Sequence, residues 1–142
     1  VLPHATQVLA DLGLEPALAR VAVATQEAVF FNRFGQLIYR EALGRAAGYD
    51  HPQFSIHRAD LHGVLLVAFR DRVGADRLHL GWKCAGFDQD EAAVTVHFVD
   101  ATTGAPRASR RAHALIGADG IHSVVRRQLF PAEGPPKYSG VN

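Results

Sequence analysis

A turn bracketed by two glycines carries the residues that are best suited to bind a ligand. The run Gly117-Ala118-Asp119-Gly120 follows a short apolar stretch and precedes a helical pattern that contains Ser123 and Arg126. Where a strand leads into a helix, glycines let the backbone approach a ligand closely, and the helical amides can bind phosphate or sugar oxygens. Asp119 could accept hydrogen bonds from sugar hydroxyls, and Ser123 or Arg126 could bind a phosphate. The alternative is structural: the glycines serve only the turn and Asp119 caps the helix.

Arg58 is a second residue with suitable chemistry, because a guanidinium can hold a phosphate by two hydrogen bonds. It stands near the start of the segment from Ser55 to Val73, whose apolar residues recur at steps of three and four. This spacing and the Gly74 that follows predict a helix that would position Arg58. Taken alone, an arginine at a helix start is more simply a surface residue.

The rest of the chain has the pattern of a mixed α/β protein. Two short helices are expected, over residues 6–14 and 15–21. A β-hairpin is expected over residues 28–31 and 36–40, because Asn32 and Gly35 suit the turn between them. Further strands are expected over residues 77–80, 83–87, 93–99, 107–111 and 112–116, and a last helix over residues 121–129. Residues 43–52 have no period and are expected to form a loop.

Composition narrows the classes of function. Hydrophobic residues make up 48% and charged residues 20%, as in folded, soluble domains. The net charge of +1 offers no field that would hold nucleic acid, and no apolar run approaches the roughly 20 residues of a membrane span. A single cysteine, Cys84, excludes an internal disulfide and fits the cytoplasm. His57 and His62 are five residues apart and do not share a helical face, so no metal site is expected.

Two longer runs resemble one known family. The run from Leu115 to Arg126 resembles the Asp-Gly motif of class A flavoprotein monooxygenases, which include para-hydroxybenzoate and salicylate hydroxylases, and the spacing of its Gly, Asp, Gly, Ser and Arg agrees. The run from Phe54 to Leu61 resembles the family's segment in which an arginine opens a helix and reaches the flavin. Within both motifs the chain is most similar to the phenazine-hydroxylase branch.

The resemblance implies an incomplete Rossmann-like FAD-binding fold with an inserted β-meander. Residues 1–24 and 51–134 would form part of an FAD-binding domain, residues 25–50 a hairpin and loop of a substrate domain, and residues 135–142 an irregular tail. No catalytic residue is identified. The implied FAD-binding residues are Arg58, Asp119, Gly120, Ser123 and Arg126.

The same resemblance implies NAD(P)H as the reductant and a small aromatic molecule as the substrate that is hydroxylated. The Gly-x-Gly-x-x-Gly turn with which the family begins is not found in these residues. We therefore expect a piece of a longer enzyme that is inactive and colourless by itself and prone to self-association. Two alternatives stay open: a non-catalytic fragment that binds a nucleotide or a protein, and a flavin oxidoreductase that does not hydroxylate.

Overall fold

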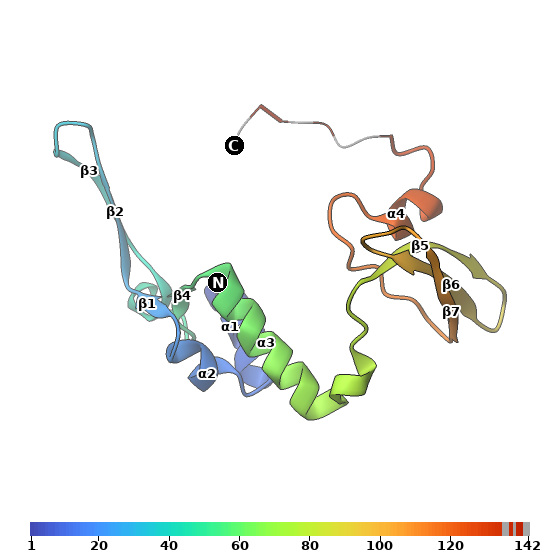
Figure 1. Cartoon of the computed structure of the whole chain (residues 1–142). Coiled ribbons are helices and arrows are strands. Elements are labelled where there is room, and N and C mark those ends of the chain that lie inside the picture. The colour runs from blue at the N-terminus through green and yellow to red at the C-terminus, as the bar shows by residue number, and fades with distance from the viewer. Residues whose placement is uncertain (135–136, 138, 141–142) are drawn as a thin grey trace. The chain divides into compact units, whose positions relative to one another are not determined.

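The computed structural model describes residues 1–134, 137 and 139–140. They form two compact units, which divide between Leu78 and His79, and each is described by itself. The first unit holds α1 (Pro3–Asp11), α2 (Glu15–Ala19), β1 (Val23–Thr25), β2 (Glu27–Phe31), β3 (Leu37–Ala42), η1 (Gly44–Ala47), β4 (Gln53–Ser55), α3 (Arg58–Val73) and η2 (Ala75–Arg77) (Figure 1). The second unit holds β5 (Trp82–Gln89), β6 (Val94–Asp100), β7 (Pro106–Ala112) and α4 (Val124–Leu129).

The helices of the first unit lie close to their expected positions. α1 begins at Pro3, three residues before the expected start, because proline lacks the N–H that the first turn leaves unpaired. Gly13 follows α1 with a φ of +68°, a conformation that glycine adopts without strain. Besides Pro3 and Pro52, the buried apolar side chains of this unit are those of Leu14, Leu18 and Phe54. α3 begins at Arg58, so the expected helix is confirmed, although Ser55 belongs to β4.

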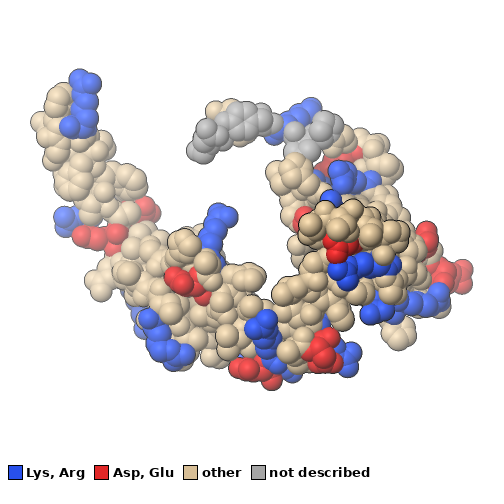
Figure 2. Space-filling view, in the orientation of Figure 1, with Lys and Arg blue, Asp and Glu red and all other residues tan. Residues whose placement is uncertain are grey.

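The predicted hairpin is confirmed as β2 and β3, which pair antiparallel with Phe30 opposite Tyr39. Asn32 builds its turn, since the side-chain Oδ1 accepts hydrogen bonds from the amides of Phe34 at 2.9 Å and Gln36 at 3.0 Å. The hairpin forms a long ribbon whose surface is mostly uncharged (Figure 2). Its large apolar side chains are more than half exposed, namely Phe30, Phe31, Phe34, Leu37, Ile38 and Tyr39.

A second pair of strands in this unit was not predicted. β1 and β4 pair antiparallel, with Ala24 opposite Phe54. Each strand has only three residues, which is too short to show an alternating pattern. The expected loop over residues 43–52 contains the short 3-10 helix η1. None of the helices in the described part of the chain is long and apolar enough to cross a membrane.

In the second unit, β5, β6 and β7 form an antiparallel sheet in chain order, at the places of three strands that the sequence predicted. Asp90 builds the first turn, because its Oδ1 accepts hydrogen bonds from the amides of Ala92 and Ala93, both at 2.8 Å. β7 is exposed along its whole length, so the arginines of residues 107–111 lie on a solvated strand. The core of the unit consists of Phe87, Val94, Val96 and Val125.

Three sequence predictions for residues 77–129 need correction. Residues 75–77 form a 3-10 turn, and no strand covers residues 77–80. The strand expected over residues 112–116 is absent from the described part of this unit: β7 ends at Ala112, and no described strand pairs with the residues after it. The last helix begins at Val124 instead of Ile121, because Ile121 and His122 form a turn that the amide of Ser123 closes on the carbonyl oxygen of Gly120. Within the expected tail, residues 135, 136, 138, 141 and 142 lie outside the described residues.

Candidate functional site

Four of the five predicted FAD-binding residues lie together, three in the turn that leads into α4 and Arg126 inside α4 itself. Ser123 is the N-cap of α4, and its Oγ accepts a hydrogen bond from the amide of Arg126 at 2.9 Å. The Ser123 hydroxyl in turn donates to Oδ1 of Asp119 at 2.5 Å. Oδ2 of Asp119 accepts from the amide of Val124 at 2.7 Å. Asp119 and Ser123 therefore cap the helix together, as the structural alternative proposed.

These donors favour the ionised form of the Asp119 carboxyl. The hydroxyl of Ser123, followed by the amide of Val124, lowers the pKa of the Asp119 carboxyl below its ordinary value, because each hydrogen bond favours the ionised form. The side chain lies on the surface. The turn thus presents a permanent carboxylate at neutral pH, with lone pairs that can accept further hydrogen bonds.

The two glycines of the turn have different roles. Gly120 has a φ of +76°, in the left-handed region that other residues adopt at a cost. Gly117 is needed for close packing, since a Cβ there would lie 2.9 Å from Cβ of Val125. Gly117 was not among the predicted FAD-binding residues. Its position at the start of the run Gly117-Ala118-Asp119-Gly120 was the sequence feature that could have indicated its importance. Gly117 thus lets the turn pack against α4, and Gly120 lets the exposed backbone take its left-handed bend.

Arg126 lies in α4 and stabilises the turn that precedes this helix. One of its terminal nitrogens donates to the carbonyl oxygen of Ile121 at 2.6 Å. Its Nε is buried and lies 2.9 Å from a carboxylate oxygen of Glu133, without the alignment of a hydrogen bond. In this structure the guanidinium is therefore engaged by neighbouring residues of the chain.

Arg58 lies in the first unit and has a different environment. It is the first residue of α3, and Nδ1 of the N-cap residue His57 accepts a hydrogen bond from the amide of Ala59 at 3.2 Å. The Arg58 side chain is exposed. Among the residues that the structure describes, none forms a hydrogen bond or an ion pair with its guanidinium. Its donors are therefore available to an anionic ligand.

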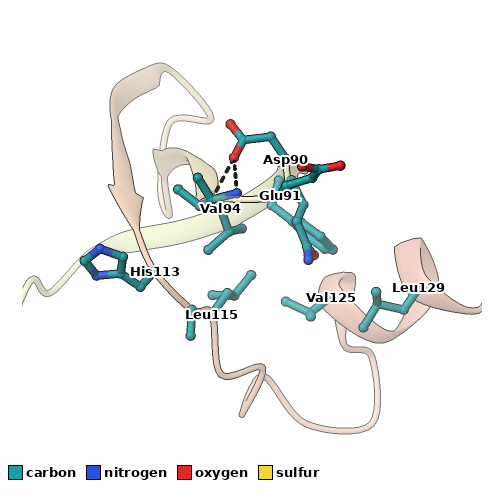
Figure 3. Close-up of a pocket in the computed structure, with 12 residues that line it drawn as sticks. Asp90, Glu91, Val94, His113, Leu115, Val125 and Leu129 are labelled. Atoms are coloured by element: carbon teal, nitrogen blue, oxygen red, sulfur yellow. Dashed lines mark hydrogen bonds between the residues drawn. The ribbon is translucent and has the colours of Figure 1, made fainter.

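A pocket in the second unit lies beside α4 but contains none of the predicted residues. It has a volume of about 280 Å³. Figure 3 shows Val94, Leu115, Val125 and Leu129 along its apolar part, with the carboxylates of Asp90 and Glu91 nearby. The Asp90 carboxylate is already engaged by the turn amides and by Arg111 at 3.0 Å. Within the described residues no three His, Cys, Asp or Glu side chains are placed to hold a metal ion.

Comparisons with known proteins agree with the resemblance of the motifs. The model of a family described as FAD binding domain matches residues 4–139. The chain is 39% identical over 131 residues to phenazine 1,6-dicarboxylic acid hydroxylase PhzS of Lysobacter antibioticus, which covers 92% of this chain and 32% of that protein. It is 36% identical to 3-amino-4-hydroxybenzoate 2-monooxygenase of Streptomyces cremeus, over 97% of this chain and 33% of that protein.

A solved structure supports the same conclusion for the fold. The flavin-dependent monooxygenase PieE, in complex with FAD and substrate, is similar with a TM-score of 0.74 at 24% identity, over 91% of this chain and 24% of that one. The chain thus spans about a third of the length of the curated relatives it matches. Its motifs, the family match and the shared fold together show that the chain belongs to the FAD binding domain family and is related to the class A FAD-dependent aromatic monooxygenases, close to the phenazine hydroxylases.

Proposed function

We propose that the protein containing this chain is an FAD-dependent monooxygenase that uses NAD(P)H to hydroxylate a small aromatic substrate. The observation that carries the proposal is the turn at Asp119, where an ionised carboxylate and a left-handed glycine lie on an exposed backbone. The curated relatives are named as hydroxylases and monooxygenases of aromatic compounds, which supports the same reaction class.

The residues present fit part of an FAD site. The Asp119 carboxylate can accept hydrogen bonds from ribityl or ribose hydroxyls, and Gly120 has no side chain to keep the cofactor away. Ser123 and Arg126 hold this turn in shape. Arg58 can bind a phosphate with two parallel hydrogen bonds. When bound, FAD would supply the redox and oxygen chemistry, while these residues supply position and charge.

The proposal also assigns parts of the chain to domains. Residues 1–24 and 51–134 would form part of a Rossmann-like FAD-binding domain, with the sheet of β5 to β7 as its inserted meander. Residues 25–50 would be a hairpin and loop of the substrate domain. The exposed apolar side chains of β2 and β3 support this assignment, because a surface of this kind is usually covered by a partner. The same surface would favour self-association of the chain by itself.

The decisive experiment uses the full-length protein. We expect it to be isolated with FAD, and to oxidise NADH or NADPH faster when a phenazine or aminohydroxybenzoate carboxylic acid is added. Mass spectrometry should then show one added oxygen atom in the aromatic product. Oxidation without that product would favour a flavin oxidoreductase, and a folded protein without FAD would favour a non-catalytic role.

A pair of variants tests the turn itself. Replacing Asp119 with Ala removes the carboxylate that both caps α4 and faces the proposed cofactor, so FAD should bind about tenfold more weakly or worse. The matched control is Asp11→Ala, which removes an exposed carboxylate at the end of α1 and should leave the affinity unchanged. Equal affinities of the two variants for FAD would contradict the proposed site.

A further inference from the structure

We propose that Gln128 is a positioning residue for the FAD-binding turn: its amide attaches α4 to the edge of β5 and so sets where Asp119 stands. The inference rests on the proposed function. Gln128 does not touch the Asp119 turn, and no pattern in the sequence distinguishes it from other polar residues at the end of a helix.

The amide of Gln128 pairs with both backbone groups of one residue. Its Oε1 accepts a hydrogen bond from the amide of Phe87 at 3.1 Å, and its Nε2 donates to the carbonyl oxygen of Phe87. β5 is an edge strand of its sheet, so these groups have no strand partner on that side among the described strands. The side chain thus supplies the donor and acceptor that a neighbouring strand would supply.

The local shape of β5 makes room for this contact. The register between β5 and β6 shifts between Cys84 and Gly86, immediately before Phe87. A Cβ on Gly86 would lie only 3.3 Å from Oε1 of Gln128. Phe87 and Gln128 are 41 residues apart in sequence, and their contact is partly buried. The pairing is therefore a specific tertiary contact between helix and sheet.

The contact matters for the turn because α4 has only six residues and a helix this short is not stable by itself. Val125, three residues before Gln128, is buried in the core with Phe87 and Val94. These contacts hold one face of α4 on the sheet. The other end of α4 holds the turn, since Ser123 bonds to Asp119 and Arg126 bonds to the carbonyl of Ile121. The position of the Asp119 carboxylate therefore depends on Gln128.

The substitution Gln128→Glu tests this with a pH profile. Ionised glutamate can still accept from the Phe87 amide but cannot donate to the Phe87 carbonyl, whereas protonated glutamate can do both. In the full-length protein we expect FAD to bind about tenfold more weakly to this variant at pH 8, with affinity rising toward the wild-type value as the pH falls to about 4, below the ordinary glutamate pKa of about 4.3. Quenching of flavin fluorescence during titration of the apoprotein with FAD measures the dissociation constant.

The matched control is Gln89→Glu, the same substitution at the exposed end of β5. It should bind FAD like the wild type at both pH values. Equal profiles for Gln128→Glu and Gln89→Glu would overturn the proposal. If Gln128→Glu is unfolded at pH 8, Gln128→Asn gives the test, because its shorter amide should weaken FAD binding while unchanged affinity overturns the proposal. Failure of the wild-type protein to bind FAD would instead refute the proposed function.

Discussion

The two regions proposed to bind FAD differ in how firmly the chain itself holds them. The Asp119 carboxylate is bonded through both oxygens, and its partner Ser123 is buried. Arg58 begins a long helix, but its side chain is exposed and has no hydrogen-bond or ion-pair partner among the described residues. A turn that is already ordered loses little conformational entropy when a ligand binds, whereas a free arginine must give up rotamer freedom. Changes at the turn should therefore affect folding and binding together, and changes at Arg58 binding alone.

The largest expected effect comes from Arg58. Replacing it with Ala in the full-length protein removes a charge-assisted contact to phosphate, worth about 1.5 to 3 kcal/mol, so the FAD dissociation constant should rise about 10- to 150-fold. Thermal stability of the apoprotein should not change, because the side chain is exposed. Arg70→Ala, near the other end of α3, is the control and should retain wild-type affinity. If Arg58→Ala lowers the stability of the apoprotein, then Arg58 affects folding as well as binding, and the two regions do not differ in this respect.

The next largest expected effect is a loss of folding stability when Gly117 is replaced. Valine at this position would bring its Cβ to 2.9 Å from Val125, so α4 would have to move, at a cost of about 1 to 3 kcal/mol in the free energy of unfolding. Urea unfolding measures this cost. Gly63→Ala is the control, because a Cβ at that helical position would meet nothing within 4 Å beyond its own stretch of helix. Its stability should be equal or higher by about 0.5 to 1 kcal/mol. A Gly117→Val protein as stable as the wild type would show that the turn is loosely held.

The smallest expected effect is a decline in the free energy of unfolding at acidic pH. Hydrogen bonds to the turn amides lower the pKa of Asp90 and Asp100, and the hydroxyl of Ser123 lowers that of Asp119. Such carboxylates stabilise the folded state fully above the unfolded pKa of about 3.9, and this stabilisation is lost as the pH falls through the lower folded values. Unfolding free energies measured between pH 6 and pH 2 should decline below about pH 4. Replacing all three with Asn should flatten that decline, and an unchanged slope would contradict it.

Much of the fold could be predicted because its signals are local. Turns built by Asn32 and Asp90 separate neighbouring strands. The helix α3 also followed from spacing within one segment, although it begins at Arg58 and not at Ser55. The pairing of β1 with β4 could not be predicted, because two strands of three residues carry no period and lie far apart in the sequence. The strand expected over residues 112–116 was wrong because an apolar run forms a strand only beside a partner.

The site was predicted less completely than the fold. The residue types at Asp119 and Ser123 suit both capping and ligand binding, and the structure shows the capping directly. Their contact with FAD stays a prediction. The roles of Gly117 and Gln128 depend on the distance to Val125 and on the open edge of β5, and both are properties of the tertiary structure. A sequence pattern carries no information on such contacts until the fold is known.

The order of the strands in the second unit has a consequence for how this unit folds. β5, β6 and β7 pair with their neighbours in chain order, so each pairing closes only a short loop. Structures with such local contacts form quickly. The contact between Phe87 and Gln128 closes a separation of 41 residues and can form only against an existing β5 edge. We therefore expect the sheet to serve as the template on which the Asp119 turn takes its shape last.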